Sequence, residues 1–354
     1  MTGASGLVGS ELAEKLLAAR PGRRVYLLTR DGRRIPERLR SSGACVLEGD
    51  LRTPDLGLPE WQVNDLRERV TEIVHCAADT RFDLSLEEAR AANVGGTNRV
   101  LDLAAKCRRL EKLIHVSSIY AAGRTTGFIR ETPLETPSEF SSSYQQTKFE
   151  AEQLVWKRAG ELPIAVVRLS SIIGDSRTGR VRQFNHVHQL MRLFPRNHLL
   201  PVVPADPEAP VDMVSTDWTV AALAWLLDGG FRAGGVFHLC SGPGFRVGEM
   251  IGLTQELFET HPRAARFRPI RVPRLVSLKE YEEFVRQTCR TGHRLLNELT
   301  RVLSFFLPHL ALRQCFDNGQ TMSHLAAANL LSPPTRDTYA KVVRYCLDTD
   351  WGRD

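Results

Sequence analysis

The chain has 354 residues, which fits two domains or one large α/β domain with an appendage. Hydrophobic residues make up 42% and charged residues 25%, which excludes disorder or a coiled coil as a description of the whole chain. The net charge of +6 favours anionic partners such as nucleotides, coenzyme A phosphates, acidic carriers or anionic lipid. No basic run is interleaved with aromatic residues, so nucleic acid is not an expected partner.

The seven cysteines are scattered and form no CxxC pair. This pattern fits reduced thiols in a cytoplasmic protein better than a disulfide framework. A transmembrane helix needs about 20 apolar residues. The most apolar stretch, residues 302–312, is too short and contains a proline, so we expect no membrane-spanning segment.

The first 170 residues alternate short β-rich runs with amphipathic helical stretches. Strands are expected at residues 24–29, 44–47, 72–76, 113–117 and 164–168, and helices at residues 10–19, 60–69, 86–107 and 142–159. This alternation predicts βαβ units and a Rossmann-like α/β fold with a doubly wound parallel sheet. Right-handed crossovers then place ligands at the carboxyl ends of the strands.

After about residue 175 the pattern changes. Prolines mark a loop at residues 201–210, and we expect further elements at residues 216–228 (helix), 236–239 (strand), 247–259 (helix), 277–307 (helix) and 337–347 (helix). The expected domains are therefore a nucleotide-binding domain over residues 1–175, a substrate-binding region over residues 176–262 and a helical C-terminal region over residues 263–354.

A glycine-rich turn opens the chain, with GxxGxxG spacing from Gly3 to Gly9. Glycines permit a tight turn and a close approach of the backbone to a pyrophosphate, and the following helix adds N–H donors. The spacing departs from GxGxxG and alone is equally typical of a turn that caps a helix, but the βα pattern that follows favours a nucleotide site. The candidate contacts are Gly3, Ser5, Gly6, Leu7, Val8 and Gly9.

A buried apolar strand normally precedes such a turn, yet only Met1 and Thr2 precede Gly3. That strand is central in the usual order. We therefore expect a truncated or misassigned chain start, a shortened first strand and exposed edges on its neighbours. Intact-mass measurement of the native protein checks this expectation.

The second expected strand ends in Leu28-Thr29-Arg30. An acidic residue about 20 positions after the glycine turn binds the ribose 2′-OH of NAD, whereas an arginine there suits a 2′-phosphate. Arg30 occupies that position, and residues 24–30 contain no acid. The sequence therefore favours NADP(H) over NAD(H). The alternative is that Arg30, Arg33 and Arg34 form a solvated turn.

Tyr144 and Lys148 are spaced i, i+4 on an expected helix and so share one face. A nearby ammonium favours tyrosinate, so we expect Lys148 to lower the pKa of Tyr144 and to let it exchange a proton with a carbonyl oxygen. Ser118, at the end of a strand, would add a second hydrogen bond to that oxygen. A YxxxK pattern is common on solvated helices, so its weight comes from the order of motifs along the chain.

That order resembles the extended branch of the short-chain dehydrogenase/reductase superfamily, over residues 2 to about 260. Three more segments are similar to its motifs: Asp50-Leu51 to its adenine-contacting pair, His75-Cys76-Ala77-Ala78 to its alanine-rich turn, and Asn93-Val94-Gly95-Gly96-Thr97 to its NxxGT helix. The resemblance implies that Ser118, Tyr144 and Lys148 are catalytic. It also implies cofactor contacts from Asp50, Leu51, Ala77, Ala78, Asn93 and Lys148.

Two segments are similar to thioester reductases, the group of fatty acyl-CoA reductases and carrier-protein terminal reductases. Residues 167–179 resemble R-x-x-x-I-x-G-D-S-x-T-G, and residues 211–218 resemble V-D-x-V-x-V-D. Leu169 departs from the usual proline, and residues 263–354 do not match a fatty acyl-CoA reductase C-terminal domain. The resemblance implies NADPH-dependent reduction of an acyl thioester, on coenzyme A or an acyl carrier protein, to an aldehyde or further to an alcohol.

Two other functions stay open: an extended-family dehydrogenase or epimerase acting on a hydroxysteroid-like or nucleotide-sugar substrate, and a non-catalytic NADP(H) sensor. The Tyr144–Lys148 pair argues against the sensor.

We expect no metal site, because His186 and His188 do not share a helical face. We expect residues 295–307 to pack in the core, the alternatives being an acyl pocket or peripheral membrane contact. Five arginines lie within residues 263–274. We expect them to meet a carrier's phosphopantetheine or coenzyme A phosphates, or to form a solvated basic surface. The oligomeric state is left open.

Overall fold

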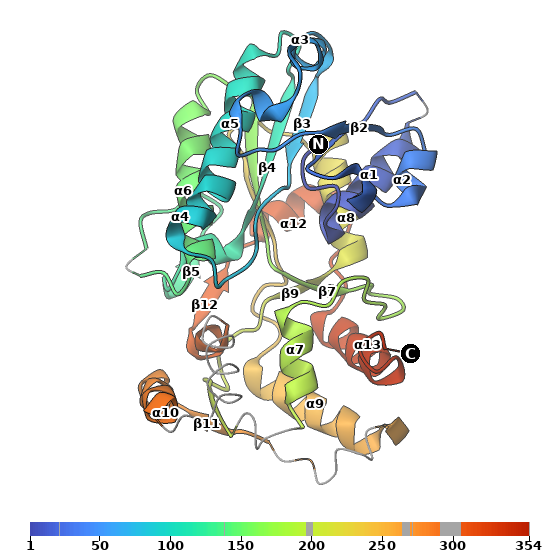
Figure 1. The fold of residues 1–354 in the computed structure, drawn as a ribbon. Coiled ribbons are helices and arrows are strands. Elements are labelled where there is room, and N and C mark those ends of the chain that lie inside the picture. Colours follow the sequence, from blue (N-terminus) through green and yellow to red (C-terminus); the bar gives the residue numbers. More distant parts are fainter. Residues whose placement is uncertain are drawn as a thin grey trace.

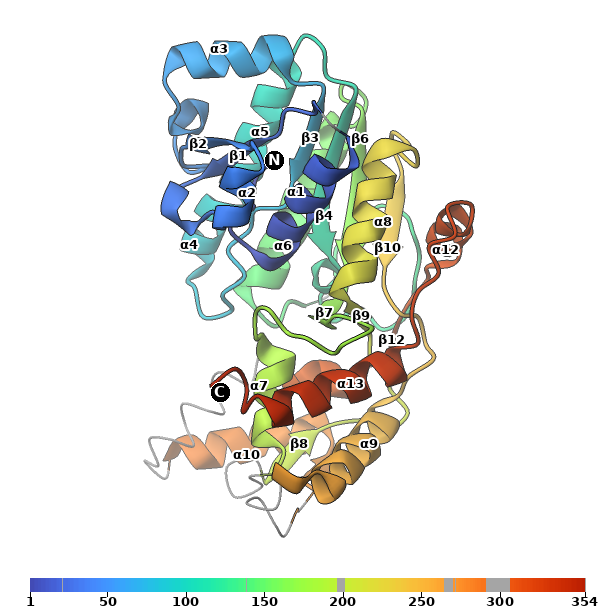
Figure 2. The same cartoon turned by 90° about the vertical axis from the view of Figure 1, so that its right-hand side faces the viewer.

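The computed structural model describes residues 1–20, 22–137, 139–195, 201–263, 270, 272–290 and 306–353. An upper part holds the main sheet with helices on both faces, and a lower part holds α7, α9, α10 and α13 (Figures 1 and 2). Among the described residues, no helix combines the length and the apolar character needed to cross a membrane.

The main sheet is parallel throughout. Its strands are β1 (Tyr26–Thr29), β2 (Cys45–Glu48), β3 (Glu72–His75), β4 (Lys112–Ser118), β6 (Ile164–Leu169) and β10 (Val236–Leu239). In space, β1 pairs with β2, and β3, β4, β6 and β10 follow one another. Strands β4 and β6 are almost wholly buried, as their continuous apolar runs predict for strands covered on both faces. This sheet confirms the predicted fold class.

The chain start lies between β1 and β3. Thr2 forms parallel bridges to Leu28 and to His75, and the amide of Leu28 donates to the carbonyl of Met1 at 2.9 Å. These two residues occupy the central position expected for the first strand. Leu27 and Val74 on the neighbouring strands are buried.

Helices cover both faces of the sheet. On one face α1 (Leu7–Ala19) packs against α8 (Thr216–Asp228), and on the other α5 (Gly95–Lys106) packs against α6 (Ser143–Arg158) (Figure 1). Leu12 and Leu16 of α1 and Leu223 of α8 belong to the largest buried cluster, which stabilises the sheet through apolar burial. Ser142 begins α6 by accepting a hydrogen bond from the Gln145 amide.

The predicted stretch of residues 86–107 forms three elements instead of one helix. These are α4 (Leu86–Ala89), the π-helical turn η3 (Arg90–Val94) and α5. The remaining helices of this half are α2 (Glu37–Ser41) and α3 (Glu60–Arg69). Insertions of a π-turn are frequent at functional sites, and η3 carries Asn93.

The lower part contains α7 (His186–Leu193), α9 (Val247–Thr260), α10 (Leu278–Arg290), the 3-10 turn η6 (Leu307–Ala311) and α13 (Thr335–Asp348). Helix α13 packs along α9 (Figure 2). Helix α10 confirms the start of the helix predicted at residue 277, while residues 291–305 of that prediction lie outside the described residues. Helix α8 and strand β10, although within the predicted substrate-binding region, return in space to the main sheet.

Three short strand pairs complete the described part of the chain. The predicted loop at residues 201–210 contains β8 (Val202–Pro204), which pairs with β11 (Arg274–Val276). Prolines disguise this strand, although they are tolerated at the edge of a sheet. Strand β7 (Ser171–Gly174) pairs with β9 (Met213–Ser215), and β5 (Gly127–Ile129) pairs with β12 (Gln314–Phe316), which leads into α12 (Gly319–Ala326) beside β10.

The end of the segment at residues 167–179, which resembles thioester reductases, packs against α13 and holds it in place. Gly179 has a φ of +72°, and a Cβ there would collide with the carbonyl of Lys341 in α13. The Lys341 ammonium also donates to the carbonyl of Ser176 at 2.9 Å. The glycine is needed because the backbone of α13 lies directly against this turn.

Candidate active site

The glycine turn lies against the end of β3. Gly3 has a φ of +80°, and a Cβ on it would lie 2.7 Å from the Cys76 carbonyl carbon, so only glycine fits. A Cβ on Gly9 would collide with the carbonyl of Gly3. No side chain caps the start of α1 at Gly6, so the first N–H groups of this helix are available to an anion. The turn therefore fits a pyrophosphate.

The remaining predicted residues of this turn also lie at its open side. Ser5 is exposed, and Leu7 and Val8 form the half-buried first residues of α1. Ala77 and Ala78 follow β3, where the Ala77 amide donates to the Thr2 hydroxyl at 3.1 Å. The turn after β3 thus lies against the glycine turn at the carboxyl edge of the sheet.

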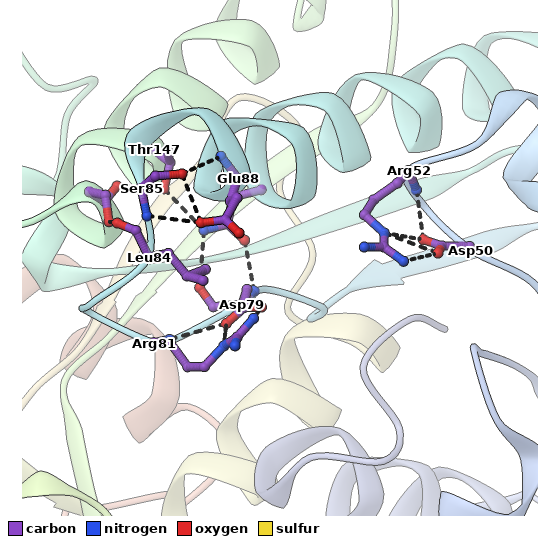
Figure 3. Close-up of polar contacts among 10 residues, drawn as sticks. Asp50, Arg52, Asp79, Arg81, Leu84, Ser85, Glu88 and Thr147 are labelled. Carbon is purple, nitrogen blue, oxygen red and sulfur yellow. Dashed lines mark hydrogen bonds and ion pairs between the residues drawn. The ribbon is translucent and has the colours of Figure 1, made fainter.

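Arginines surround this edge. Arg30 is exposed at the end of β1, and in the part of the chain that the structure describes it has no ion-pair partner. In contrast, Arg52 binds the Asp50 carboxylate at 2.6 Å and Arg81 binds that of Asp79 at 2.8 Å (Figure 3). Each of these paired arginines is the main cause that lowers the pKa of its carboxylate, and Arg30 adds to both effects. Within the described residues, Arg30 is therefore a cation without an ion-pair partner that acts on both carboxylates.

Arg33 fits the alternative prediction of a solvated turn. Arg33 is 90% exposed and its guanidinium binds Asp31 at 3.0 Å. The Asp31 carboxylate also accepts from the Arg33 amide and begins a 3-10 turn. Arg33 is thus already neutralised by a neighbour, unlike Arg30.

Asn93 holds the loop after β3 against α6. Its amide nitrogen donates to the Asp79 carbonyl at 3.1 Å and to the Thr147 hydroxyl at 3.0 Å, and its oxygen accepts from the Asp79 amide at 2.7 Å. Nearby, Ser85 and Glu88 cap α4 (Figure 3). Ser143 of α6 donates to the Leu84 carbonyl. Because Thr147 precedes Lys148, Asn93 positions the part of α6 that carries the predicted catalytic pair. A direct contact with the cofactor stays a prediction.

The structure brings Ser118, Tyr144 and Lys148 together. Ser118 ends β4 and hydrogen-bonds to the Tyr144 side chain, while α6 carries Tyr144 and Lys148. The Lys148 ammonium donates to the Val116 carbonyl on β4 at 2.9 Å. All three predicted residues are less than 9% exposed. They lie where β4 ends, the edge at which parallel sheets bind ligands.

The predicted direction of the Tyr144 pKa is wrong in this structure. Burial raises the pKa of Tyr144 to about 12, although the hydrogen bond from Ser118 opposes the rise. Burial also lowers the pKa of Lys148 to about 8. The ammonium is bound to a backbone carbonyl of β4 and does not act as a counterion for a phenolate. At neutral pH, Tyr144 is therefore a protonated phenol, which suits it to donate a proton.

A large apolar cavity lies beyond these residues. Its empty space, which opens to solvent, measures about 1180 Å³, and its walls come mainly from α7, the segment that leads into β9, α9 and η6. The sequence predicts that residues 295–307 pack in the core, with a pocket wall as one alternative. Phe306 and Leu307 line the cavity, as that alternative predicts, and Leu307 is also fully buried in a packed cluster. The polar residues on its wall are Tyr120, Ser171, His186, Asp212, Thr254, His309, Gln314 and Tyr339.

Sequence reasoning missed several residues between the cavity and Tyr144. The Tyr120 hydroxyl hydrogen-bonds to Ser171 at 3.1 Å and lies 3.4 Å from His186 Nε2. Burial lowers the pKa of His309 to about 4, so its neutral Nε2 accepts from the Gln145 amide at 2.6 Å. Tyr120 was detectable from its place two residues after Ser118. His309 gave no sequence signal.

Of the two histidines in this helix, His188 has a structural role. His188 begins α7 by accepting from the Asn185 amide, and its other nitrogen binds the Ile173 carbonyl at 2.9 Å. Within the described ranges, no group of three or more His, Cys, Asp or Glu residues is arranged to hold a metal ion. Of the five arginines predicted at a basic surface, Arg263 and Arg274 are described, and residues 266, 268 and 271 lie outside the described residues.

Comparison with known proteins identifies a family model and related reductases. An NAD-binding family model described as male sterility protein matches residues 1–223. Fatty acyl-CoA reductase 1 of Xenopus laevis is 30% identical over 222 residues, which cover 50% of this chain and 43% of the frog protein. The chain thus spans less than half the length of that relative.

Two solved structures share the fold across the chain. The terminal R domain from the myxalamid PKS-NRPS biosynthetic pathway has a TM-score of 0.81 and 24% identity, covering 99% of this chain and 90% of that chain. A thiolation-reductase di-domain from an archaeal non-ribosomal peptide synthetase has a TM-score of 0.72 and 16% identity, covering 99% and 75%. At these identities the likeness concerns the fold.

Proposed function

Since the chain belongs to the NAD-binding male sterility protein family, we propose that it is an NADPH-dependent reductase of acyl thioesters that releases an aldehyde. Its family confirms the predicted resemblance to the thioester reductase branch of extended short-chain dehydrogenases/reductases. We propose coenzyme A or an acyl carrier protein as the carrier of the acyl group, in line with the names of the frog reductase and of the thiolation-reductase di-domain. The observation that carries the proposal is a buried Ser118–Tyr144–Lys148 group between the glycine turn and an apolar cavity.

When bound, NADPH supplies the hydride that reduces the acyl carbon. Tyr144 and Ser118 hydrogen-bond to the thioester carbonyl oxygen, and Tyr144 donates its proton as negative charge develops there. Lys148 binds the nicotinamide ribose through its ammonium. The resulting hemithioacetal loses its hydroxyl proton and breaks its C–S bond, so the products are an aldehyde and a free thiol. A protonated Tyr144, as burial favours, is the form that this step needs.

The test is NADPH oxidation, followed by absorbance, with a series of acyl-CoA substrates and identification of the aldehyde. The proposed function predicts oxidation with acyl-CoA. Oxidation only with ketosteroids or sugar nucleotides indicates the dehydrogenase or epimerase alternative. An absence of turnover with every substrate, despite NADPH binding, indicates a sensor.

Arg30 should determine the preference for NADPH. Replacing Arg30 with alanine is expected to weaken NADPH binding about 10- to 100-fold, because a charge-assisted hydrogen bond to the 2′-phosphate is lost. NADH binding should change little. The dissociation constants of both nucleotides, measured by calorimetry, check this expectation. Arg33→Ala is the matched control, since Arg33 is already bound to Asp31; equal losses in both variants contradict the assignment.

Lys148 should set the alkaline limit of activity. Its ammonium is present below a pKa of about 8 and is lost above it. We therefore expect kcat/KM for reduction to fall as the pH rises through about 8, while Tyr144, with its pKa of about 12, stays protonated. Lys148→Arg, whose charge persists, should move that fall to higher pH. A profile that stays flat to pH 10 in the wild type argues against this role.

A further inference from the structure

A chain of ring contacts connects Tyr144 to the apolar cavity. We call Phe82, His186 and Phe306 the aromatic wall. Phe82, in the loop after β3, lies 5.1 Å from the ring of Tyr144 and 4.2 Å from that of Phe306, measured between ring centroids. His186 and Phe306 are stacked at 4.0 Å with planes 3° apart. His186 and Phe306 line the cavity, whereas Phe82 and Tyr144 are not among its lining residues.

The described rings of the wall are in close contact and uncharged. Ring separations of this size are van der Waals contacts, so no hydrocarbon chain fits between the rings as they stand. Burial lowers the pKa of His186 to about 3, so its imidazole is neutral, and Tyr120 lies within 3.4 Å of its Nε2. The wall also joins two parts of the molecule, because Phe82 belongs to the nucleotide-binding half while His186 and Phe306 belong to the cavity side.

We propose that the aromatic wall is a gate that selects acyl groups by their width and favours unbranched apolar chains. This inference rests on the proposed function, which places the acyl carbon beside the Tyr144 hydroxyl. From that point, a chain reaches the cavity by parting Phe82 from Phe306. An unbranched chain needs the smallest separation, whereas a methyl branch next to the carbonyl forces the rings further apart and breaks more of their contacts. A charged acyl group also loses its hydration against these rings without gaining a partner.

The gate predicts a change of specificity in Phe306→Ala. We expect kcat/KM for a 2-methyl-branched acyl-CoA, divided by that for the straight-chain acyl-CoA of equal carbon number, to rise about tenfold or more, the scale of discrimination that one methyl group gives in an apolar pocket. Phe128→Ala is the matched control. Phe128 is 62% exposed on β5 and is not among the residues that line the cavity, so the ratio in Phe128→Ala should equal that of the wild type.

The outcomes separate the gate from the reaction. If the wild type reduces straight-chain acyl-CoA and Phe306→Ala leaves the ratio unchanged, the gate is wrong and the proposed function stands. If the wild type reduces no acyl thioester, both are wrong. Should Phe306→Ala fail to fold, as judged by lost NADPH binding, Phe82→Leu replaces the opposite ring with a smaller side chain. This variant also widens the opening, so it must raise the same ratio for the gate to hold.

Discussion

Tyr144→Phe is expected to lower kcat for acyl-CoA reduction about a hundred- to ten-thousandfold, the usual contribution of a positioned general acid. The substitution removes a single oxygen, the one that hydrogen-bonds to Ser118 and is proposed to protonate the thioester oxygen. Because the ring remains, its contact with Phe82 is kept. The dissociation constant for NADPH should therefore change little. Stopped-flow measurement of hydride transfer, together with nucleotide titration, tests both parts.

A matched control lies in the last helix. Tyr345 is half-buried in α13 and packs against a different cluster, so Tyr345→Phe should keep wild-type kcat. Turnover that persists in Tyr144→Phe shows that another group delivers the proton. A loss of NADPH binding in parallel with kcat shows instead that Tyr144 holds the nucleotide site together.

The sheet and the catalytic group were predictable because their signals are local. Alternating β-rich and amphipathic stretches identified every main strand, and the apolar runs of β4 and β6 match their burial on both faces. Tyr144 and Lys148 were found from a spacing that helix geometry fixes. Strand ends and helix starts then brought Ser118 and the glycine turn to the same edge of the sheet.

The features that sequence reasoning missed depend on distant packing. Helical spacing placed Lys148 beside Tyr144. The burial that raises the pKa of Tyr144 involves residues distant in sequence, such as Phe82, and could not be predicted from that spacing. The aromatic wall joins residues 82, 186 and 306, which no periodicity connects. The strand β8 was hidden by prolines that an edge position tolerates.

Long-range packing also explains why Glu152→Ala should destabilise the fold strongly. Glu152 of α6 and Arg168 of β6 are fully buried and joined at 2.5 Å, and Ser117 donates to the same carboxylate at 2.9 Å. Arg168 also donates to Thr132 O at 2.8 Å and to His238 Nε2 at 2.8 Å. Burial lowers the pKa of His238 to about 3, so this neutral ring accepts from Arg168. Removing the carboxylate leaves a buried cation without its counterion.

We expect Glu152→Ala to lower the free energy of unfolding by about 3–5 kcal/mol, the range for breaking a buried pair on one side. Urea unfolding followed by circular dichroism measures it. The matched control lies half a turn away: Glu150 binds Arg90 at 2.6 Å, but at the surface, so Glu150→Ala should cost less than about 1 kcal/mol.

The double variant Glu152→Ala/Arg168→Met shows whether the Glu152–Arg168 pair stabilises the fold by neutralising a charge or through the hydrogen bonds of Arg168. If the loss in the single variant comes from an uncompensated charge, replacing Arg168 with an apolar side chain should recover much of it. If the loss instead comes from the hydrogen bonds that Arg168 makes to the chain at residues 130 and 132, the double variant should be less stable still. Because Tyr144 and Lys148 lie on the same helix as Glu152, a shift of α6 should also lower turnover in step with stability. Glu150→Ala should instead keep wild-type turnover and lose less than about 1 kcal/mol of stability.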